Sequence, residues 1–147
     1  ATDFDSVFID SNRARPENRW PIEYQVHDML SGPLPEDFDG AYALDVIEHI
    51  PAAQEHTFVG NMVRSLGPQG VCIVGCPSLQ SQAYASPPSR EGHVNCKDGP
   101  GLRALLSDFF HNVFVFSMND EVVHTGFYPM AHYLLGLGCG PKRDALR

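Results

Sequence analysis

Positive charge is scarce in this sequence of 147 residues. Lys and Arg number 10 against 18 Asp and Glu, which gives a formal net charge of −8. Proteins that bind nucleic acid need a basic face to neutralise phosphates, so we expect no nucleic-acid partner. The same shortage disfavours an anionic membrane, and no apolar run approaches the roughly 18 residues of a spanning helix. We therefore expect no membrane partner either.

Cysteines are few, and their spacing does not fit a zinc site. Cys72 and Cys76 lie four apart, while Cys96 and Cys139 form no second close pair. Zinc sites built from cysteine use two such pairs. We interpret the thiols as small buried groups of a protein that works in the reducing cytoplasm.

The order of apolar patterns predicts an α/β fold. Hydrophobic residues make up 43% of the chain, and apolar runs predict strands at 6–10, 22–30, 41–47, 71–77 and 112–119. Helical spacing predicts helices at 52–66 and 102–110, whereas 132–140 is either a last strand or a short helix. Between them, 78–101 is a long irregular loop, which is more often functional than idle. We expect a mostly parallel sheet with 41–47 at its centre, between the strands of Tyr24 and Ile73.

Acidic residues follow three of the predicted strands. Asp10 ends the first, Asp28 ends the second, and Asp45, Glu48 and His49 follow the third in FDGAYALDVIEHI. In open α/β sheets, ligands bind outside the carboxyl ends of the strands. A carboxylate there can accept two hydrogen bonds from a ribose diol, and another can accept from an adenine amino group. The pattern favours a nucleotide-like ligand at this edge of the sheet.

Three segments carry a resemblance to a known family. FDGAYALDVIEHIP, a helix and LGPQGVCIVGCPS resemble the second half of a class I S-adenosylmethionine (SAM)-dependent methyltransferase of the small-molecule type. GHVNCKDGPGLRALLSDFF resembles a later segment of that family, so the similarity covers about 7–133. The resemblance implies a Rossmann-like, mostly parallel sheet with helices on both faces and a C-terminal antiparallel hairpin. It also implies SAM as the cofactor, and methyl transfer to oxygen or nitrogen of a small-molecule substrate.

The resemblance assigns the cofactor-binding residues one by one. Asp10 matches the acid that holds the ribose hydroxyls, and Asp28 matches the acid that accepts from the adenine amino group. Met29 would lie against the adenine ring. Leu44 and Asp45 would face the methionine part of the cofactor and the reacting centre.

Three further residues are candidates on the substrate side. Glu48 follows the third strand, where the resemblance implies substrate binding in several members of the family. His93 lies in the long loop, whose length favours a functional role. His49 is the candidate catalytic base, because histidine titrates near neutral pH. The two histidines also have a structural interpretation: His49 as a surface histidine beside a helix, and His93 as a helix cap. Asp45, Glu48 and His49 could instead hold a divalent metal, as in quinone-type O-methyltransferases, but our prediction assigns no metal.

The family's first strand and its glycine-rich GxGxG turn have no counterpart in this sequence. We therefore expect residues 1–147 to form a single, N-terminally incomplete methyltransferase domain that binds SAM weakly or not at all. Whether it is an active enzyme or an inactive fragment stays open at this point. An unpaired sheet edge tends to pair with another chain, so we expect a homo-oligomer. The alternative function is a non-catalytic α/β module that binds a nucleotide-like ligand or a partner chain.

Overall fold

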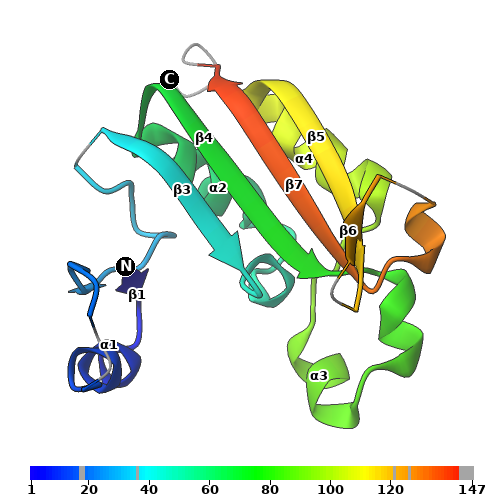
Figure 1. Cartoon of the computed structure of the whole chain (residues 1–147), viewed down its shortest axis with the longest axis horizontal. Helices are drawn as coiled ribbons and strands as arrows, with labels where there is room; N and C mark the ends of the chain where they lie inside the picture. Colours follow the sequence, from blue (N-terminus) through cyan, green and yellow to red (C-terminus); the bar gives the residue numbers. More distant parts are fainter. Residues whose placement is uncertain (17–18, 36, 121, 126, 143–147) are drawn as a thin grey trace.

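The largest element of the fold is a five-stranded sheet (Figure 1). The computed structural model describes residues 1–16, 19–35, 37–120, 122–125 and 127–142. The strands run in the order β3-β4-β7-β5-β6. Their bounds are Phe38–Leu44 for β3, Leu66–Pro77 for β4, Tyr133–Pro141 for β7, Phe110–Asn119 for β5 and Val122–His124 for β6. β3 and β4 are parallel, and the other neighbouring pairs are antiparallel.

The N-terminal residues form a separate small unit beside β3 (Figure 1). Strands β1, Thr2–Asp3, and β2, Gln25–Val26, pair in parallel. Helix α1, Ser6–Arg13, connects them, and its N-terminus is capped by Asp5, whose carboxylate accepts from the backbone N–H of Val7. This capping turns 6–10 into helix, so the strand predicted there is wrong.

Two helices cover one face of the large sheet. They are α2, Glu55–Arg64, and α4, Gly99–Phe109, which contact each other behind β4 and β7. β7 lets α4 approach closely through glycines: a Cβ on Gly136 would lie 2.5 Å from Leu106, and one on Gly138 would lie 2.3 Å from Phe110. Leu106 and Phe110 thereby join the buried core.

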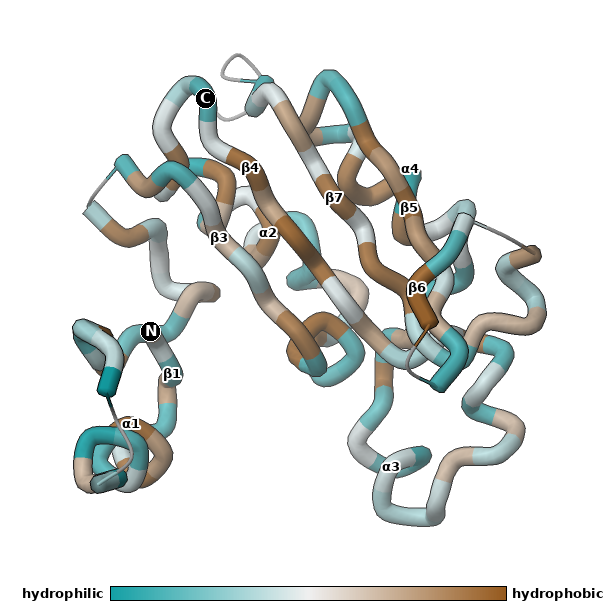
Figure 2. Tube along the Cα trace, viewed as in Figure 1, coloured by the Kyte–Doolittle hydropathy of each residue, from teal (hydrophilic) through white to brown (hydrophobic). Residues whose placement is uncertain are grey.

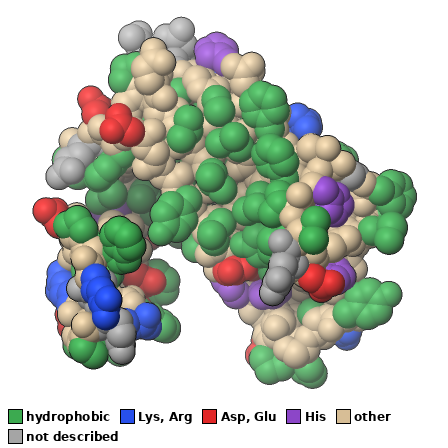
Figure 3. Space-filling model, in the orientation of Figure 1, with side chains coloured by type: hydrophobic (Ala, Val, Ile, Leu, Met, Phe, Trp, Pro, Cys, Tyr) green, Lys and Arg blue, Asp and Glu red, His purple; other side chains and the backbone are tan. Residues whose placement is uncertain are grey.

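The opposite face of the sheet is apolar and exposed. One cross-strand row runs Tyr42, Ile73, Leu137 and Phe114 over β3, β4, β7 and β5. Tyr42 is 76% exposed and Phe114 is 52% exposed. Hydrophobic side chains gather over this face in Figure 3, and Figure 2 shows hydrophobic residues along β4, β7 and β5. Large exposed apolar patches are typical of interaction sites.

Short helices occupy the loops at the carboxyl ends of β3 and β4. They are η1, Ile47–His49; η2, Gln80–Tyr84; and α3, Pro87–Gly92, with η3, Tyr128–Met130, in the later loop. No helix of the described residues is long and apolar enough to cross a membrane.

Two further strand predictions differ from the structure. Of 22–30, only Gln25–Val26 is a strand, and it pairs with β1 and not with β3. β3 does pair with the strand of Ile73, as predicted, but it ends the described five-stranded sheet and is not central in it. The near-continuous apolar run in β3 therefore serves the core on one face and an exposed surface on the other.

Candidate functional site

A cavity of about 620 Å³ lies between the small N-terminal unit and the carboxyl end of β3. The residues from the N-terminal side include Asp3, Phe4, Asp28, Met29 and Leu30, and those from the β3 side include Tyr42, Leu44, Asp45, Val46 and His49. Strand ends of both sheets therefore meet here, as the strand-tip pattern predicted. The volume suits a small-molecule ligand.

Asp28 projects from a turn that its own side chain stabilises. Its carboxylate accepts from the backbone N–H of Leu30 at 2.9 Å, and its carbonyl accepts from the N–H of Ser31. The buried Asn61 side chain of α2 donates to the Met29 carbonyl at 2.6 Å. Residues 28 and 29 are thus held in place at the cavity, while Asp28 itself stays exposed.

Asp3 is the acid that directly ends β1, and the sequence interpretation missed it. Its carboxylate accepts from the N–H of Asp5 at 2.8 Å, which fixes the turn from β1 into α1. The sequence signal was short: a two-residue strand that ends in Asp3, followed by one apolar residue and the helix cap.

Asp10, which was predicted to hold the ribose hydroxyls, lies outside the cavity. It is in α1, does not line the cavity and pairs with Arg13 at 3.2 Å on the helix surface. The correction follows from the capping by Asp5, which continues the helix past residue 10. Asp3 therefore replaces Asp10 as the acid at the end of the first strand.

Asp45 turns the chain sharply at the end of β3. Its φ of 56° lies in the left-handed region, which aspartate tolerates better than most residues. Its N–H donates to the carbonyl of Gly75 and to the Tyr133 hydroxyl. Burial and the nearby Asp45 charge raise the pKa of Tyr133, which keeps this phenol neutral. The turn directs the following residues, Glu48 and His49, under the long loop.

Glu48 and His49 lie side by side in η1, but in different surroundings. Glu48 is 1% exposed, whereas His49 is exposed and lines the cavity. Burial raises the pKa of Glu48. One of its oxygens, Oε1, lies 3.9 Å from His49 Nε2, and the other, Oε2, has no hydrogen-bond partner within the part of the chain that the structure describes.

His93 from the long loop joins this pair. Its ring packs edge-on against that of His49, with centroids 5.2 Å apart. It also lines a second hollow of about 590 Å³, together with Gln82, Arg90 and Cys96. Of the predicted site residues, the structure thus brings Asp28, Met29, Leu44, Asp45 and His49 to one cavity, and Glu48 and His93 to its edge.

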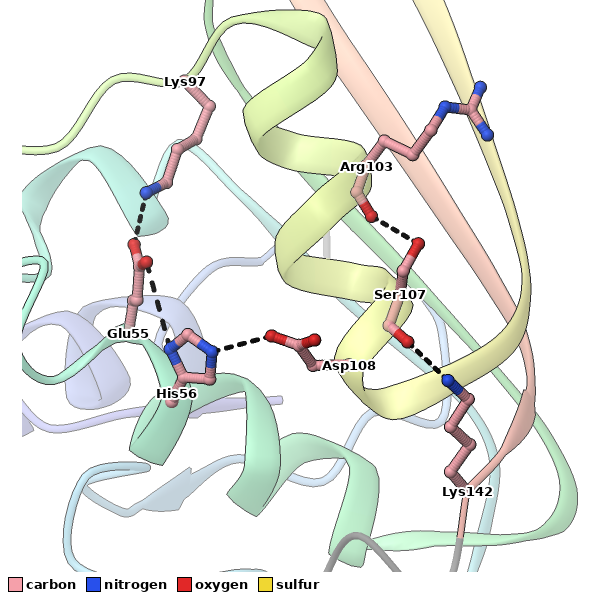
Figure 4. Close-up of polar contacts among 7 residues, drawn as sticks. All are labelled: Glu55, His56, Lys97, Arg103, Ser107, Asp108 and Lys142. Atoms are coloured by element: carbon pink, nitrogen blue, oxygen red, sulfur yellow. Dashed lines mark hydrogen bonds and ion pairs between the residues drawn. The ribbon is translucent and has the colours of Figure 1, made fainter.

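A partly buried ion pair holds the loop of His93 onto α2 (Figure 4). Glu55 accepts from Lys97 at 2.5 Å and from the Asn95 amide at 2.7 Å. Burial alone would raise the pKa of Glu55, but the hydrogen bonds from Lys97 and Asn95 hold it below its usual range. The carbonyl of Glu48 also accepts from the N–H groups of Val94 and Asn95. The contacts position His93 opposite His49.

We expect Glu55→Gln to destabilise the protein by roughly 1–3 kcal/mol at pH 7, because Lys97 loses its charged partner. Because the pKa of Glu55 is lowered by folding, its contribution is present above the ordinary glutamate pKa of about 4.3 and is lost as the pH falls through the folded value. Denaturant unfolding of the wild type and of Glu55→Gln at pH 7 and pH 3 measures the loss of stability and its pH dependence. Asp108→Ala, which breaks the exposed His56–Asp108 pair without removing a partner of Glu55, is the control and should change little. Equal effects of Glu55→Gln at both pH values would contradict this account.

The family assignment rests on sequence. A family model described as a methyltransferase domain matches residues 1–74, which carry Asp3, Asp28, Asp45 and His49. The chain belongs to the class I SAM-dependent methyltransferase family. SAM is accordingly the cofactor that its fold is built to hold. A comparison with curated protein sequences finds no match.

Solved methyltransferases share the fold. The N-methyltransferase NodS from Bradyrhizobium japonicum WM9 is 19% identical, with a TM-score of 0.64 over 96% of this chain and 72% of NodS. NodS in complex with S-adenosyl-L-homocysteine (SAH) gives 20% identity and a TM-score of 0.61 over 96% of this chain and 65% of that one. PH0226 from Pyrococcus horikoshii OT3 is 18% identical, with a TM-score of 0.71 over 96% of this chain and 70% of PH0226. The predicted α/β, Rossmann-like fold with antiparallel C-terminal strands is confirmed. The prediction of a mostly parallel sheet with helices on both faces is wrong for the described five-stranded sheet, which has one parallel pair and helices α2 and α4 on one face.

Proposed function

We propose that this methyltransferase domain binds the adenosyl part of SAM in the 620 Å³ cavity and transfers the methyl group to oxygen or nitrogen of a small molecule. One observation carries the proposal: Asp3 and Asp28, each at the end of a strand of the same small sheet, line one cavity with Met29. Two carboxylates and an apolar side chain that line one cavity match a ribose diol and an adenine ring.

Each lining residue then has a role. Asp3 accepts from the ribose hydroxyls, Asp28 accepts from the adenine amino group, and Met29 lies against the ring. Leu44 and Asp45 face the methionine end of the cofactor. Glu48 and His93 lie on the acceptor side, where the second hollow begins.

SAM supplies an activated methyl group, so the protein mainly has to position donor and acceptor. The acceptor's lone pair forms the new bond to carbon as the carbon–sulfur bond breaks. His49 is the base for an acceptor that must lose a proton. Its Nδ1 donates to the Gly92 carbonyl at 2.9 Å, which leaves Nε2 with a lone pair.

We expect the chain to bind SAM and SAH weakly. Asp3 and Asp28 offer charge-assisted hydrogen bonds of roughly 1.5–3 kcal/mol each. None of the described residues that line the cavity is Lys or Arg, so the amino-acid carboxylate of the ligand gains no such partner. Lost ligand freedom costs roughly 4 kcal/mol or more. We therefore expect a dissociation constant of about a millimolar or weaker.

The matched pair Asp3→Ala and Asp10→Ala tests the cofactor assignment. Asp3→Ala should weaken SAH binding about tenfold, because it removes the acceptor for the ribose. Asp10→Ala should leave the affinity unchanged, since Asp10 lies on the outer surface of α1. NMR-monitored titration reaches this affinity range. Equal effects of the two variants would overturn the assignment of Asp3.

We further propose that the chain self-associates through its exposed sheet face. The row of Tyr42, Ile73, Leu137 and Phe114 is uncharged, so two copies of this acidic chain can meet there without the repulsion expected elsewhere. Light scattering should show a dimer or larger species. Phe114→Glu should shift it toward monomer, whereas Val122→Glu, on the exposed strand β6, should not. A wild-type monomer at all concentrations would contradict the proposal.

We also propose that residues 1–147 act as one domain in the cytoplasm. The four cysteines are free, as expected in a reducing compartment. Burial raises the pKa of Cys72 and Cys76 to about 12, which makes these thiols inert.

A further inference from the structure

We infer that Glu48, His49 and His93 form a binding site for a divalent first-row transition-metal ion. One ligand atom from each of the three residues lies within 4.8 Å of the other two. The sequence suggested Asp45, Glu48 and His49 as possible metal ligands, without His93, and our prediction assigned no metal. The third residue comes from the long loop, 44 positions after His49, and sequence spacing could not reveal it.

Glu48 provides the first argument. Its side chain is 1% exposed, yet its Oε2 has no hydrogen-bond partner among the described residues, and its pKa is raised by burial. A buried carboxylate oxygen without a hydrogen-bond partner is costly, and binding a cation is one way to offset that cost. The histidines beside it are the only other members of the cluster among the described residues, so the cation would share them.

The two histidines provide the second argument, through their orientation. His49 Nδ1 lies 2.9 Å from the Gly92 carbonyl, and His93 Nδ1 lies 2.9 Å from the side-chain oxygen of Gln82. Both partners are acceptors, so each Nδ1 carries the proton and each Nε2 keeps its lone pair. Metal-binding histidines are held in this way, with one ring nitrogen donating to an oxygen and the other free for the ion.

The ligand set indicates the kind of ion. Two imidazoles and one carboxylate suit Zn²⁺, Co²⁺ or Fe²⁺ better than Mg²⁺ or Ca²⁺, which prefer oxygen ligands. The ligand atoms of a zinc ion are about 3.4 Å apart, slightly closer than His49 Nε2 and Glu48 Oε1 at 3.9 Å. Three protein ligands leave a position for an exogenous ligand.

The three-residue cluster borders both hollows, because His49 lines the 620 Å³ cavity and His93 lines the 590 Å³ hollow. If the proposed methyl transfer holds, the ion would bind the acceptor's oxygen and lower the pKa of its hydroxyl. With the ion bound, Nε2 of His49 is a metal ligand and no longer the base, so the hydroxyl proton would go to solvent. The oxygen lone pair would take the methyl group as the carbon–sulfur bond of SAM breaks. The metal site itself does not depend on that reaction.

Co²⁺ alone is a suitable probe, because its visible spectrum reports its ligands. Titration calorimetry of the full chain, without SAM, should show one Co²⁺ per chain with a spectrum of nitrogen and oxygen ligation. His49→Ala and His93→Asn should each weaken binding about tenfold or more. Asparagine at 93 keeps a donor for Gln82, so the loop should stay folded, as amide NMR spectra would verify.

His56→Ala is the matched control, because His56 is a half-exposed histidine on α2 outside the cluster. It should bind Co²⁺ like the wild type. Equal losses in all three histidine variants would indicate nonspecific binding and overturn the site. So would the absence of one-to-one binding, or a thiolate spectrum that disappears in Cys96→Ser. Failure here would leave the SAH titrations of Asp3→Ala unaffected, so the two proposals can fail separately.

Discussion

Glu48→Gln is expected to stabilise the metal-free protein at pH 8 by roughly 1–3 kcal/mol, or about 3–8 °C in Tm. The reason is that Glu48 is buried with one oxygen unpartnered, and burial raises its pKa. Because its folded pKa lies above the unfolded value, folding is favoured while the group is protonated, and stability is lost as the pH rises through the folded pKa. Glutamine has no such titration.

Thermal melts at pH 4 and pH 8 in the presence of a chelator measure this effect. The gain from Glu48→Gln should be small at pH 4 and full at pH 8. Glu55→Gln is the natural comparison, since it is a nearby glutamate whose pKa is lowered and whose replacement should destabilise at neutral pH. Loss of stability in Glu48→Gln at pH 8 would show that the carboxylate has a partner that we have not identified. In the metal-binding account, saturating Co²⁺ should stabilise the wild type and not the variant.

Asp28→Ala is expected to weaken SAH binding about 10- to 100-fold, the value of one charge-assisted hydrogen bond. Because the wild-type affinity is itself weak, the variant should show no saturation in the millimolar range. The side chain also accepts from the Leu30 N–H, so alanine removes a turn contact as well.

Asp28→Asn separates the two roles. Asparagine keeps an oxygen for the Leu30 N–H and loses the charge that would strengthen the bond to the adenine amino group. It should preserve the stability of the turn and still lose most of the affinity. If Asp28→Asn bound SAH as well as the wild type, the negative charge of Asp28 would have no role in recognition. If Asp28→Ala also did so, the adenine assignment would fail.

Local patterns predicted the elements that bury one continuous apolar set. β4, β5 and α4 follow from runs such as VCIVG and LRALLSDFF, and each lies in the core. The segment SVFID was wrongly predicted as a strand, because a short apolar run does not distinguish helix from strand. In the structure Val7 and Phe8 are exposed on a helix that starts at a cap. The central position expected of β3 depended on pairing that its sequence cannot specify.

The candidate site was predictable where it follows strand ends. Asp28, Asp45 and His49 were found in this way and share the cavity. The burial of Glu48 was not predictable, because it arises when Val94 and Asn95 of a distant loop donate to the Glu48 carbonyl. The same holds for the contact of Glu55 with Lys97, which joins residues 42 positions apart. These contacts are nonlocal and leave no periodic signal in the sequence.

The most direct test of the account is a titration of the ¹⁵N-labelled chain with SAH, followed by amide NMR. Binding of the adenosyl group between the small sheet and β3 predicts saturable shifts at Asp3, Phe4, Asp28 and Met29, with a dissociation constant near millimolar. Shifts confined to the hollow lined by Gln82, His93 and Cys96, or no saturable shifts at all, would contradict it.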